Sequence, residues 1–314
     1  MFCFAVILLY LIGFSKSEIL QNCTCLPYYQ CSDDTGNVVM DGNGLIDVRG
    51  YKTSNCTGYF DVCCDIANGL VTTETSQLER KGCGYHNMES DSQWSGILLN
   101  HEIPDHEGIY KCGVSLIHPQ VALTAAHCLQ SPNKYWSINI ADTYRQIVSV
   151  VVHPYYNSGT LQNDLVLLFL KTPYNHAEIV CIPPPGTILD GSHCSAITKD
   201  FSKIKIIQLP IVGRAKCQNL LRETRLGPYF QLHSSFLCAG GEDFLDVCEG
   251  DGGSPLICPI PAQTDRFHQV GIVSWGIGCG ENNTPGVYVD LSKFRDWIDE
   301  EMIRKNFNIN TYRY

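Results

Sequence analysis

Cysteine content constrains this chain more than any other feature of its sequence. It has 17 cysteines, and one of them, Cys3, lies in an apolar N-terminal run that is typical of a signal peptide. Loss of that signal leaves 16 cysteines, an even number that fits eight disulfides in an oxidising compartment. The alternative is zinc, but no C-x-x-C pair is matched by a second pair at the spacing of zinc modules. We therefore expect no metal and no cofactor.

Residues 1–17 predict a signal peptide and secretion. Residues 4–14 are largely apolar, and the small Ser15 and Ser17 precede a cleavage position at Glu18. The alternative for this run is a short buried strand. It is too short to span a bilayer, and no later segment reaches about 18 apolar residues, so we expect an extracellular protein without a membrane partner. The net charge of −10 argues against nucleic acid, because phosphate backbones are held by excess Lys and Arg.

The remaining cysteines fall into two groups, which indicate two domains. Six crowd the segment 18–64, which is too small to be stable through burial alone and would need three bridges of about 2–4 kcal/mol each. Residues 65–82 are polar and lack cysteine, which is typical of a linker. Residues 83–314 hold the other ten cysteines and are long enough for a large core.

The residue pattern of 83–314 predicts an all-β fold. Short β-branched runs alternate with turn residues, the pattern of a barrel or a sandwich. These runs span 146–152, 165–170, 205–209, 270–275 and 286–289. Only the end has helical spacing, with Phe294, Trp297, Ile298 and Met302 on one face after Ser292 as the cap.

Three segments resemble the catalytic segments of chymotrypsin-type serine proteases. They are Leu-Thr-Ala-Ala-His-Cys around His127, Asn-Asp-Leu-Val-Leu-Leu around Asp164, and Cys-Glu-Gly-Asp-Gly-Gly-Ser-Pro-Leu around Gly252, in the family's His, Asp, Ser order. The resemblance covers residues 83 to about 303 and implies a chymotrypsin-like double β-barrel with a C-terminal helix. The six-cysteine segment ahead of it resembles a clip domain of arthropod proteases. The whole chain is similar to clip-domain serine protease homologues of the prophenoloxidase-activating factor 2 type.

Glycine at position 252 predicts the loss of catalysis. The family motif Gly-Asp-Ser-Gly-Gly-Pro reads Gly-Asp-Gly-Gly-Ser-Pro here. Acyl transfer needs an oxygen nucleophile within about 2.6–3.2 Å of the histidine, and Gly252 has none. Ser254 is the candidate for rescue, but its α-carbon lies up to about 7 Å further along an extended chain, so the turn would have to be rebuilt. If Ser254 did act, the protein would be a trypsin-like endopeptidase.

Other positions of the former site follow from the same resemblance. Asp246 matches the aspartate that pairs with a basic substrate side chain, although a solvated loop aspartate is the alternative. Gly276 and Gly286 match the small residues of that specificity pocket, and the Gly250 N–H is the remnant of the oxyanion hole. The short stretch between Cys128 and His153 predicts no calcium loop, and residues 195–200 replace the family's Gly-Trp-Gly stretch, which predicts a remodelled wall.

Activation also departs from the family pattern. In related zymogens, cleavage before an Ile-Val-Gly-Gly-like sequence frees an amine that pairs with a buried aspartate, here Asp251. No such sequence lies between Cys83 and Cys112. Asp251 therefore needs another partner, because an unpaired buried carboxylate is costly.

The resemblance also implies how every mature cysteine pairs. The implied bonds are Cys83–Cys181, Cys112–Cys128, Cys194–Cys258, Cys217–Cys238 and Cys248–Cys279 in the barrels, and Cys23–Cys63, Cys25–Cys56 and Cys31–Cys64 in the clip domain.

Modification sites can be predicted from short motifs. Sequons place N-glycosylation at Asn282, Asn22 and Asn55, of which Asn282 is preferred because the other two have cysteine in the middle of the motif. The basic pair Arg80-Lys81 and the clip residue Arg49 are candidate cleavage sites, with ordinary surface charge as the alternative for the pair.

Together these features imply an inactive adaptor in an extracellular proteolytic cascade. The resemblance suggests prophenoloxidase activation, melanization and innate immunity in haemolymph, with an upstream clip-domain serine protease and prophenoloxidase as partners. A third hypothesis, besides the active endopeptidase, is a recognition protein that binds microbial polysaccharide.

Overall fold

The computed structural model describes most of the second domain and two short segments of the first. The described residues are 23–27, 61–65, 82–85, 94–103, 108–131, 135–175, 178–199, 204–242, 247–263, 265–280 and 283–314. The chain divides into two compact units, Met1–Glu79 and Arg80–Tyr314.

The first unit contains a two-stranded antiparallel sheet. Strand β1 (Cys23–Pro27) pairs with β2 (Asp61–Asp65), and the register places Cys25 opposite Cys63. The three disulfides expected in the clip domain depend on side chains outside the described part of the chain.

The second unit begins with a closed antiparallel barrel in the strand order β3-β4-β5-β8-β7-β6. Strands β5 and β8 are buried along their whole length, because their side chains are almost all aliphatic or aromatic and face either the barrel interior or the packing around it. Closure leaves no free sheet edge. The strands are β3 (Ser95–His101), β4 (Ile109–His118), β5 (Val121–Thr124), β6 (Tyr135–Ile140), β7 (Thr143–Val152) and β8 (Val166–Leu170).

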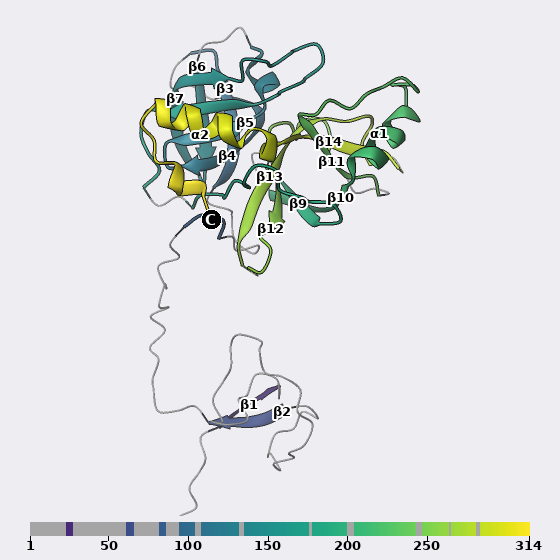
Figure 1. The fold of residues 1–314 in the computed structure, drawn as a ribbon. Helices are drawn as coiled ribbons and strands as arrows, with labels where there is room; N and C mark the ends of the chain where they lie inside the picture. The colour runs from purple at the N-terminus through teal and green to yellow at the C-terminus, as the bar shows by residue number, and fades with distance from the viewer. Residues whose placement is uncertain are drawn as a thin grey trace, which may run out of the picture. The chain divides into compact units, whose positions relative to one another are not determined.

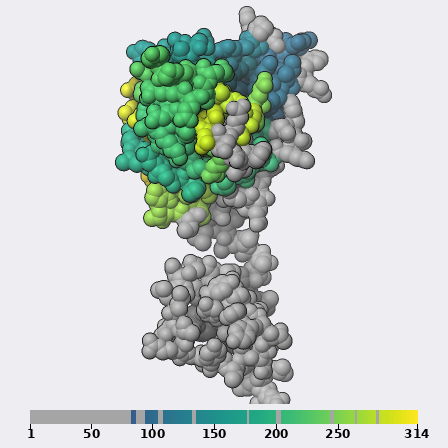
Figure 2. Space-filling view, turned by 90° about the vertical axis from the view of Figure 1, so that its right-hand side faces the viewer, coloured from purple at the N-terminus to yellow at the C-terminus, as the bar shows by residue number. Residues whose placement is uncertain are grey.

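A second closed antiparallel barrel follows in the order β10-β11-β14-β13-β12-β9 and lies beside the first (Figure 1). Figure 2 shows the side of the molecule on which this barrel lies. Its strands are β9 (His193–Lys199), β10 (Ile204–Val212), β11 (Phe236–Gly240), β12 (Pro255–Pro259), β13 (Phe267–Trp275) and β14 (Pro285–Asp290). The runs predicted from sequence fall on β7, β8, β10, β13 and β14, so the prediction of an all-β double barrel is confirmed.

The C-terminal helix is present, but its start differs from the prediction. A short 3-10 helix, η3 (Leu291–Lys293), comes first, and α2 spans Arg295–Arg304. The cap of η3 is Asp290, whose Oδ1 accepts the Ser292 N–H at 3.1 Å. Ser292 was therefore wrong as the cap, because its hydroxyl donates to the same Asp290 carboxylate instead. None of the helices in the described residues is long and apolar enough to cross a membrane.

A second α-helix, α1 (Arg214–Arg222), was not predicted from sequence. Its buried residues are Cys217 and Leu221, which lie one turn apart on the same face, so only two positions of this short helix mark it in the sequence. The Cys217–Cys238 disulfide ties this helix to β11. The disulfide and the burial of this apolar face together hold α1 on the second barrel.

Candidate functional site

The site is built around Asp164, which lies just before β8 and is fully buried. Its Oδ2 atom lies 2.7 Å from His127 Nδ1 and accepts the Ser274 hydroxyl at 2.7 Å. Its Oδ1 accepts the backbone N–H of His127 at 2.8 Å. Three hydrogen bonds from two other segments satisfy a carboxylate that would otherwise be costly to bury.

His127 lies in a short helical turn whose position is fixed by a disulfide. Strand β5 runs into the 3-10 helix η2 (Ala126–Leu129), and Cys128 in that helix is bonded to Cys112 of β4. With the Nδ1 proton directed to Asp164, the free edge of the imidazole carries Nε2. The ring is one quarter exposed, so its free edge can be reached from outside.

Nε2 of His127 faces Gly252, the position at which the sequence motif predicts a lost serine. A β-carbon built on Gly252 would lie 2.7 Å from Nε2 and 3.3 Å from Cε1, closer than side chains approach one another. The imidazole therefore occupies part of the volume that a side chain at position 252 would need. The Gly252 backbone is held in place because its carbonyl accepts the Gly113 N–H at 2.9 Å.

The neighbouring Gly253 has to be glycine. Its φ is +76°, and a β-carbon there would lie 2.2 Å from Thr124 Oγ1. Its N–H donates to the Val273 carbonyl at 2.9 Å, which ties the loop to β13.

Ser254, the candidate for a rescuing nucleophile, lies in the interior. It is fully buried, and its Oγ has no hydrogen-bond partner among the described residues. A β-carbon built on Gly113 would lie 2.3 Å from this oxygen, so the hydroxyl packs against the backbone of β4. An oxygen enclosed in this way cannot contact a peptide substrate. The side chain that lies nearest to the Gly252 position is His127, not Ser254.

Asp251 has a hydrogen-bond partner other than a freed amine, as the sequence predicted. Its Oδ2 accepts the Cys248 N–H at 2.8 Å, and its own N–H donates to the Cys248 carbonyl at 3.0 Å. Among the described residues no cation pairs with Asp251, and its half-buried position reduces the cost of that absence. Gly250, with φ of +98°, accepts the Tyr110 hydroxyl on its carbonyl at 2.7 Å. The loop is thus closed by backbone contacts within it and by one side chain from β4.

The residues expected to form the specificity pocket are only partly described. Gly286 is buried on β14 opposite Ala239, whereas Gly276 is exposed and a β-carbon there would meet only the Gly278 carbonyl oxygen, at 3.9 Å. An open hollow of about 560 Å³ lies between Ile277 and the segment that carries Arg225, and Gly276 does not line it. Several predicted sites lie outside the described residues: Asp246, Asn22, Asn55, Asn282, Arg49, Arg80 and Lys81.

Four of the five disulfides implied for the barrels are present. They are Cys83–Cys181, Cys112–Cys128, Cys194–Cys258 and Cys217–Cys238. The fifth implied bond, Cys248–Cys279, is not formed in this structure, where both cysteines are exposed, and this pairing stays a prediction. Both lie in irregular loops, whereas Cys194 and Cys258, for example, lie on neighbouring strands whose pairing sets their separation.

One group of potential metal ligands lies beside the site. It consists of a ring nitrogen of His127 and the sulfurs of Cys112 and Cys128, and these atoms lie within 4.8 Å of one another. The two sulfurs are bonded to each other and so cannot act as thiolate ligands.

Comparison with known proteins identifies this architecture. A family model described as trypsin matches residues 85–298. The chain belongs to the trypsin family. A second model, described as the serine protease clip domain PPAF-2, matches residues 15–65, so this member of the trypsin family is a clip-domain serine protease homologue.

Three relatives resemble the chain over most of their length. Phenoloxidase-activating factor 2 of Galleria mellonella is 39% identical over 288 residues, which cover 76% of this chain and 95% of that protein. Inactive CLIP domain-containing serine protease A8 of Anopheles gambiae is 33% identical over 330 residues, 90% of each chain. The A28 protein of the same mosquito is 32% identical over 304 residues, 81% of this chain and 80% of its own.

Two contacts of this trypsin-family site could not be found from sequence. Ser274 bonds to Asp164 across 110 positions of the chain, and only the folding of β13 against the start of β8 brings them together. Tyr110 reaches the Gly250 loop from β4, 140 positions away. Both are single polar residues on strands, and no local motif marks either one.

Proposed function

We propose that this protein is a secreted, catalytically inactive serine protease homologue that acts as an adaptor or cofactor in an extracellular proteolytic cascade. The cascade that fits best is prophenoloxidase activation, which leads to melanization in innate immunity. The observation that carries the proposal is Gly252, which presents no oxygen to His127 Nε2. The names of the relatives from Galleria and Anopheles agree with both parts of it.

The absence of catalysis follows from the chemistry that the site lacks. Acyl transfer requires a nucleophile that gives its proton to the histidine, and Gly252 has no such group. Removal of the serine from a related catalytic arrangement costs about 10⁶-fold in kcat. Ser254 offers no substitute, because its hydroxyl is buried against Gly113. His127 and Asp164 then have nothing to activate and act as structure.

A binding role is supported by what the chain retains. Asp164 keeps three hydrogen bonds, and the 248–254 loop is closed by Cys248 and Tyr110, so the surface around the former site is fixed without any catalytic use. A rigid, protease-shaped surface can dock an upstream clip-domain serine protease and a downstream zymogen, here prophenoloxidase, without cutting either.

The linker is the part of the chain that we propose is regulated. A trypsin-like protease that cleaves at Arg80 or Lys81 cuts ahead of Cys83. The Cys83–Cys181 bond lies within the second unit, so it does not hold the clip domain to the barrels after such a cut. Arg49 is a second candidate cleavage site, and Asn282 is the preferred glycosylation site.

The test measures prophenoloxidase activation by a purified activating protease, with and without this protein. A basic-residue peptide substrate is assayed in parallel. We expect the protein to raise phenoloxidase activity and to leave the peptide intact. Peptide cleavage that disappears in Ser254→Ala would show that the protein is an enzyme. Intact peptide with no rise in phenoloxidase activity would reject the adaptor role in this cascade.

A further inference from the structure

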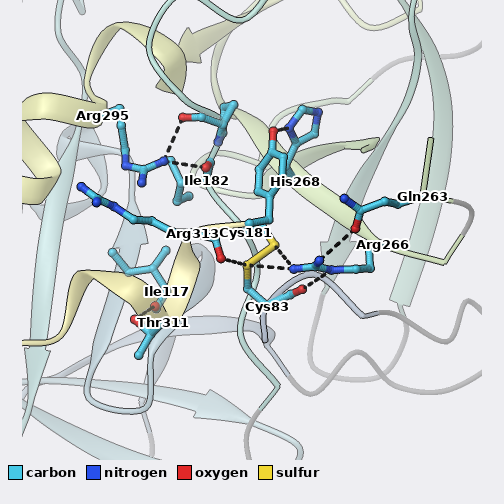
Figure 3. The surroundings of a disulfide bond; sticks show 12 residues. Cys83, Ile117, Cys181, Ile182, Gln263, Arg266, His268, Arg295, Thr311 and Arg313 are labelled. Carbon is cyan, nitrogen blue, oxygen red and sulfur yellow. Dashed lines mark hydrogen bonds between the residues drawn. A yellow bond between two sulfur atoms is a disulfide. The ribbon is translucent and has the colours of Figure 1, made fainter. Parts of the chain in front are cut away.

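The Cys83–Cys181 disulfide lies where the two ends of the second unit meet (Figure 3). Cys83 is near the N-terminal end of that unit, and Arg313 and Tyr314 end the chain. Both cysteines have no exposed surface and pack with Ile260 and Ile179 in a small apolar cluster. Because neither cysteine is exposed, the residues around the bond decide whether a reagent can reach it.

The N-terminal side of the bond is covered by its own backbone. The Gly84 N–H donates to the Ile179 carbonyl at 2.7 Å, and the Gly84 carbonyl accepts the Phe267 N–H at 2.7 Å. The φ of Gly84 is +85°, and a β-carbon there would lie 2.7 Å from Cys181 Sγ. Only glycine lets the chain pass this close to the sulfur.

Arg266 forms a second wall of the same enclosure. Its Nε donates to the Cys83 carbonyl at 3.0 Å, and one terminal nitrogen donates to Gln263 Oε1 at 2.9 Å. The other terminal nitrogen lies 3.6 Å from Cys181 Sγ and 3.8 Å from Cys83 Sγ. The guanidinium also stacks over the ring of Tyr85, 5.1 Å from its centroid.

The C-terminal residues 309–314, which we call the C-terminal latch, close the third side. The Arg313 carbonyl oxygen lies 3.4 Å from Cys83 Sγ. Tyr312 is fully buried, its hydroxyl donates to Asp299 at 2.7 Å, and its carbonyl accepts the Ile182 N–H at 3.0 Å. The Tyr314 hydroxyl lies 2.6 Å from Nδ1 of the buried His268.

The first half of helix α2 fixes the latch in turn. Arg295, which is almost fully buried, donates from one terminal nitrogen to the Ile182 carbonyl at 2.8 Å and from Nε to Asp299 at 2.9 Å. Asp299 also accepts the Tyr312 and Arg313 side chains. The same network therefore holds the latch and the chain segment next to Cys181.

We propose that the C-terminal latch seals the Cys83–Cys181 disulfide and thereby controls whether this bond can be reduced. In reduction, a thiolate of the reductant attacks one sulfur, the S–S bond breaks, and the other cysteine leaves as a thiolate that takes up a proton. A second reductant thiol then displaces the first cysteine from the mixed disulfide, and the reductant leaves oxidised. Because both sulfurs are enclosed, the first attack requires the latch to open.

The experiment compares the full-length protein with a chain that ends at Tyr312. Both are treated with dithiothreitol under native conditions, new thiols are alkylated, and each disulfide is quantified by peptide mass spectrometry. We expect Cys83–Cys181 to be reduced about tenfold faster in the shortened chain, since contacts that hold a local opening closed have been removed. Cys194–Cys258, which is equally buried in the second barrel, is the internal reference and keeps its rate.

Two variants of full length keep the test valid if the shortened chain does not fold. Tyr314→Phe removes only the hydroxyl at His268, and Tyr229→Phe removes a hydroxyl from a side chain that is 93% exposed and far from the latch in sequence. We expect faster reduction in Tyr314→Phe and an unchanged rate in Tyr229→Phe. Equal rates in all variants would overturn the proposal, and so would equal acceleration of both disulfides, which would indicate global unfolding.

Discussion

Restoring serine at position 252 should not restore a protease. A β-carbon at this position would lie 2.7 Å from His127 Nε2, so the imidazole has to retreat by at least 0.3 Å to avoid a clash and by 0.7 Å to reach ordinary contact at 3.4 Å. That movement is resisted by two bonds from His127 to Asp164, which is itself held by Ser274. We expect Gly252→Ser to lose about 1–3 kcal/mol of unfolding free energy, the usual cost of overpacking.

The kinetic consequence can be estimated from the same displacement. A catalytic group misplaced by about 1 Å costs about 100-fold in rate. The assays are urea unfolding, hydrolysis of an arginine peptide substrate, and labelling with a fluorophosphonate. We expect Gly252→Ser, alone or combined with Ser254→Gly, to stay about 100-fold or more below an active trypsin, with Ser254→Gly alone as the inactive control. Activity within about tenfold of trypsin, without loss of stability, would refute the reasoning about the ring.

Three further outcomes are expected. Ser254→Ala should keep or raise the unfolding free energy in urea, by up to about 1–2 kcal/mol, because it removes a buried hydroxyl without a partner; a large loss would show that the hydroxyl is satisfied. Asp164→Ala should destabilise the fold by about 3 kcal/mol in the same assay, since His127 and Ser274 lose their acceptor, and a neutral result would contradict the structural role. Burial lowers the pKa of His268 from 6.5 to about 4, so the unfolded chain binds a proton between these values that the folded protein excludes. Stability should therefore fall by up to about 3 kcal/mol as the pH drops from 6.5 to 4, and His268→Asn should flatten this slope in urea titrations at several pH values; an unchanged slope would assign it to other groups.

The sequence predicted the strands well because their chemistry is local. Runs such as 165–170 are continuous and apolar, and a buried barrel strand needs little else. Helix α1 was missed for the opposite reason, because it buries only Cys217 and Leu221 and depends on a disulfide to β11. The cap at Ser292 failed because the Ser292 hydroxyl donates to the Asp290 carboxylate, and Asp290, two positions earlier, accepts the Ser292 N–H as the cap of η3.

The site was predicted as residue types, and its geometry was not. His127, Asp164 and Gly252 were identified from their motifs. The short distance between the imidazole and the Gly252 position depends on the packing of distant segments, which no motif encodes. The burial of Ser254 against Gly113 likewise results from the pairing of loop and strand. The pairing of Cys248 with Cys279 stays a prediction, because both residues lie in loops whose separation no strand pairing fixes.

The position of the Cys83–Cys181 bond has a mechanical consequence. Tension applied to the chain ahead of Gly82 enters the folded unit through this bond and through Arg266, next to strand β13, and not through β3, the first strand of the barrel. A force that pulls on β3 would unzip its pairs with β4 and β6 one at a time, whereas a force borne by a covalent cross-link is spread over the second barrel. The first barrel can therefore stay closed while the linker is under load.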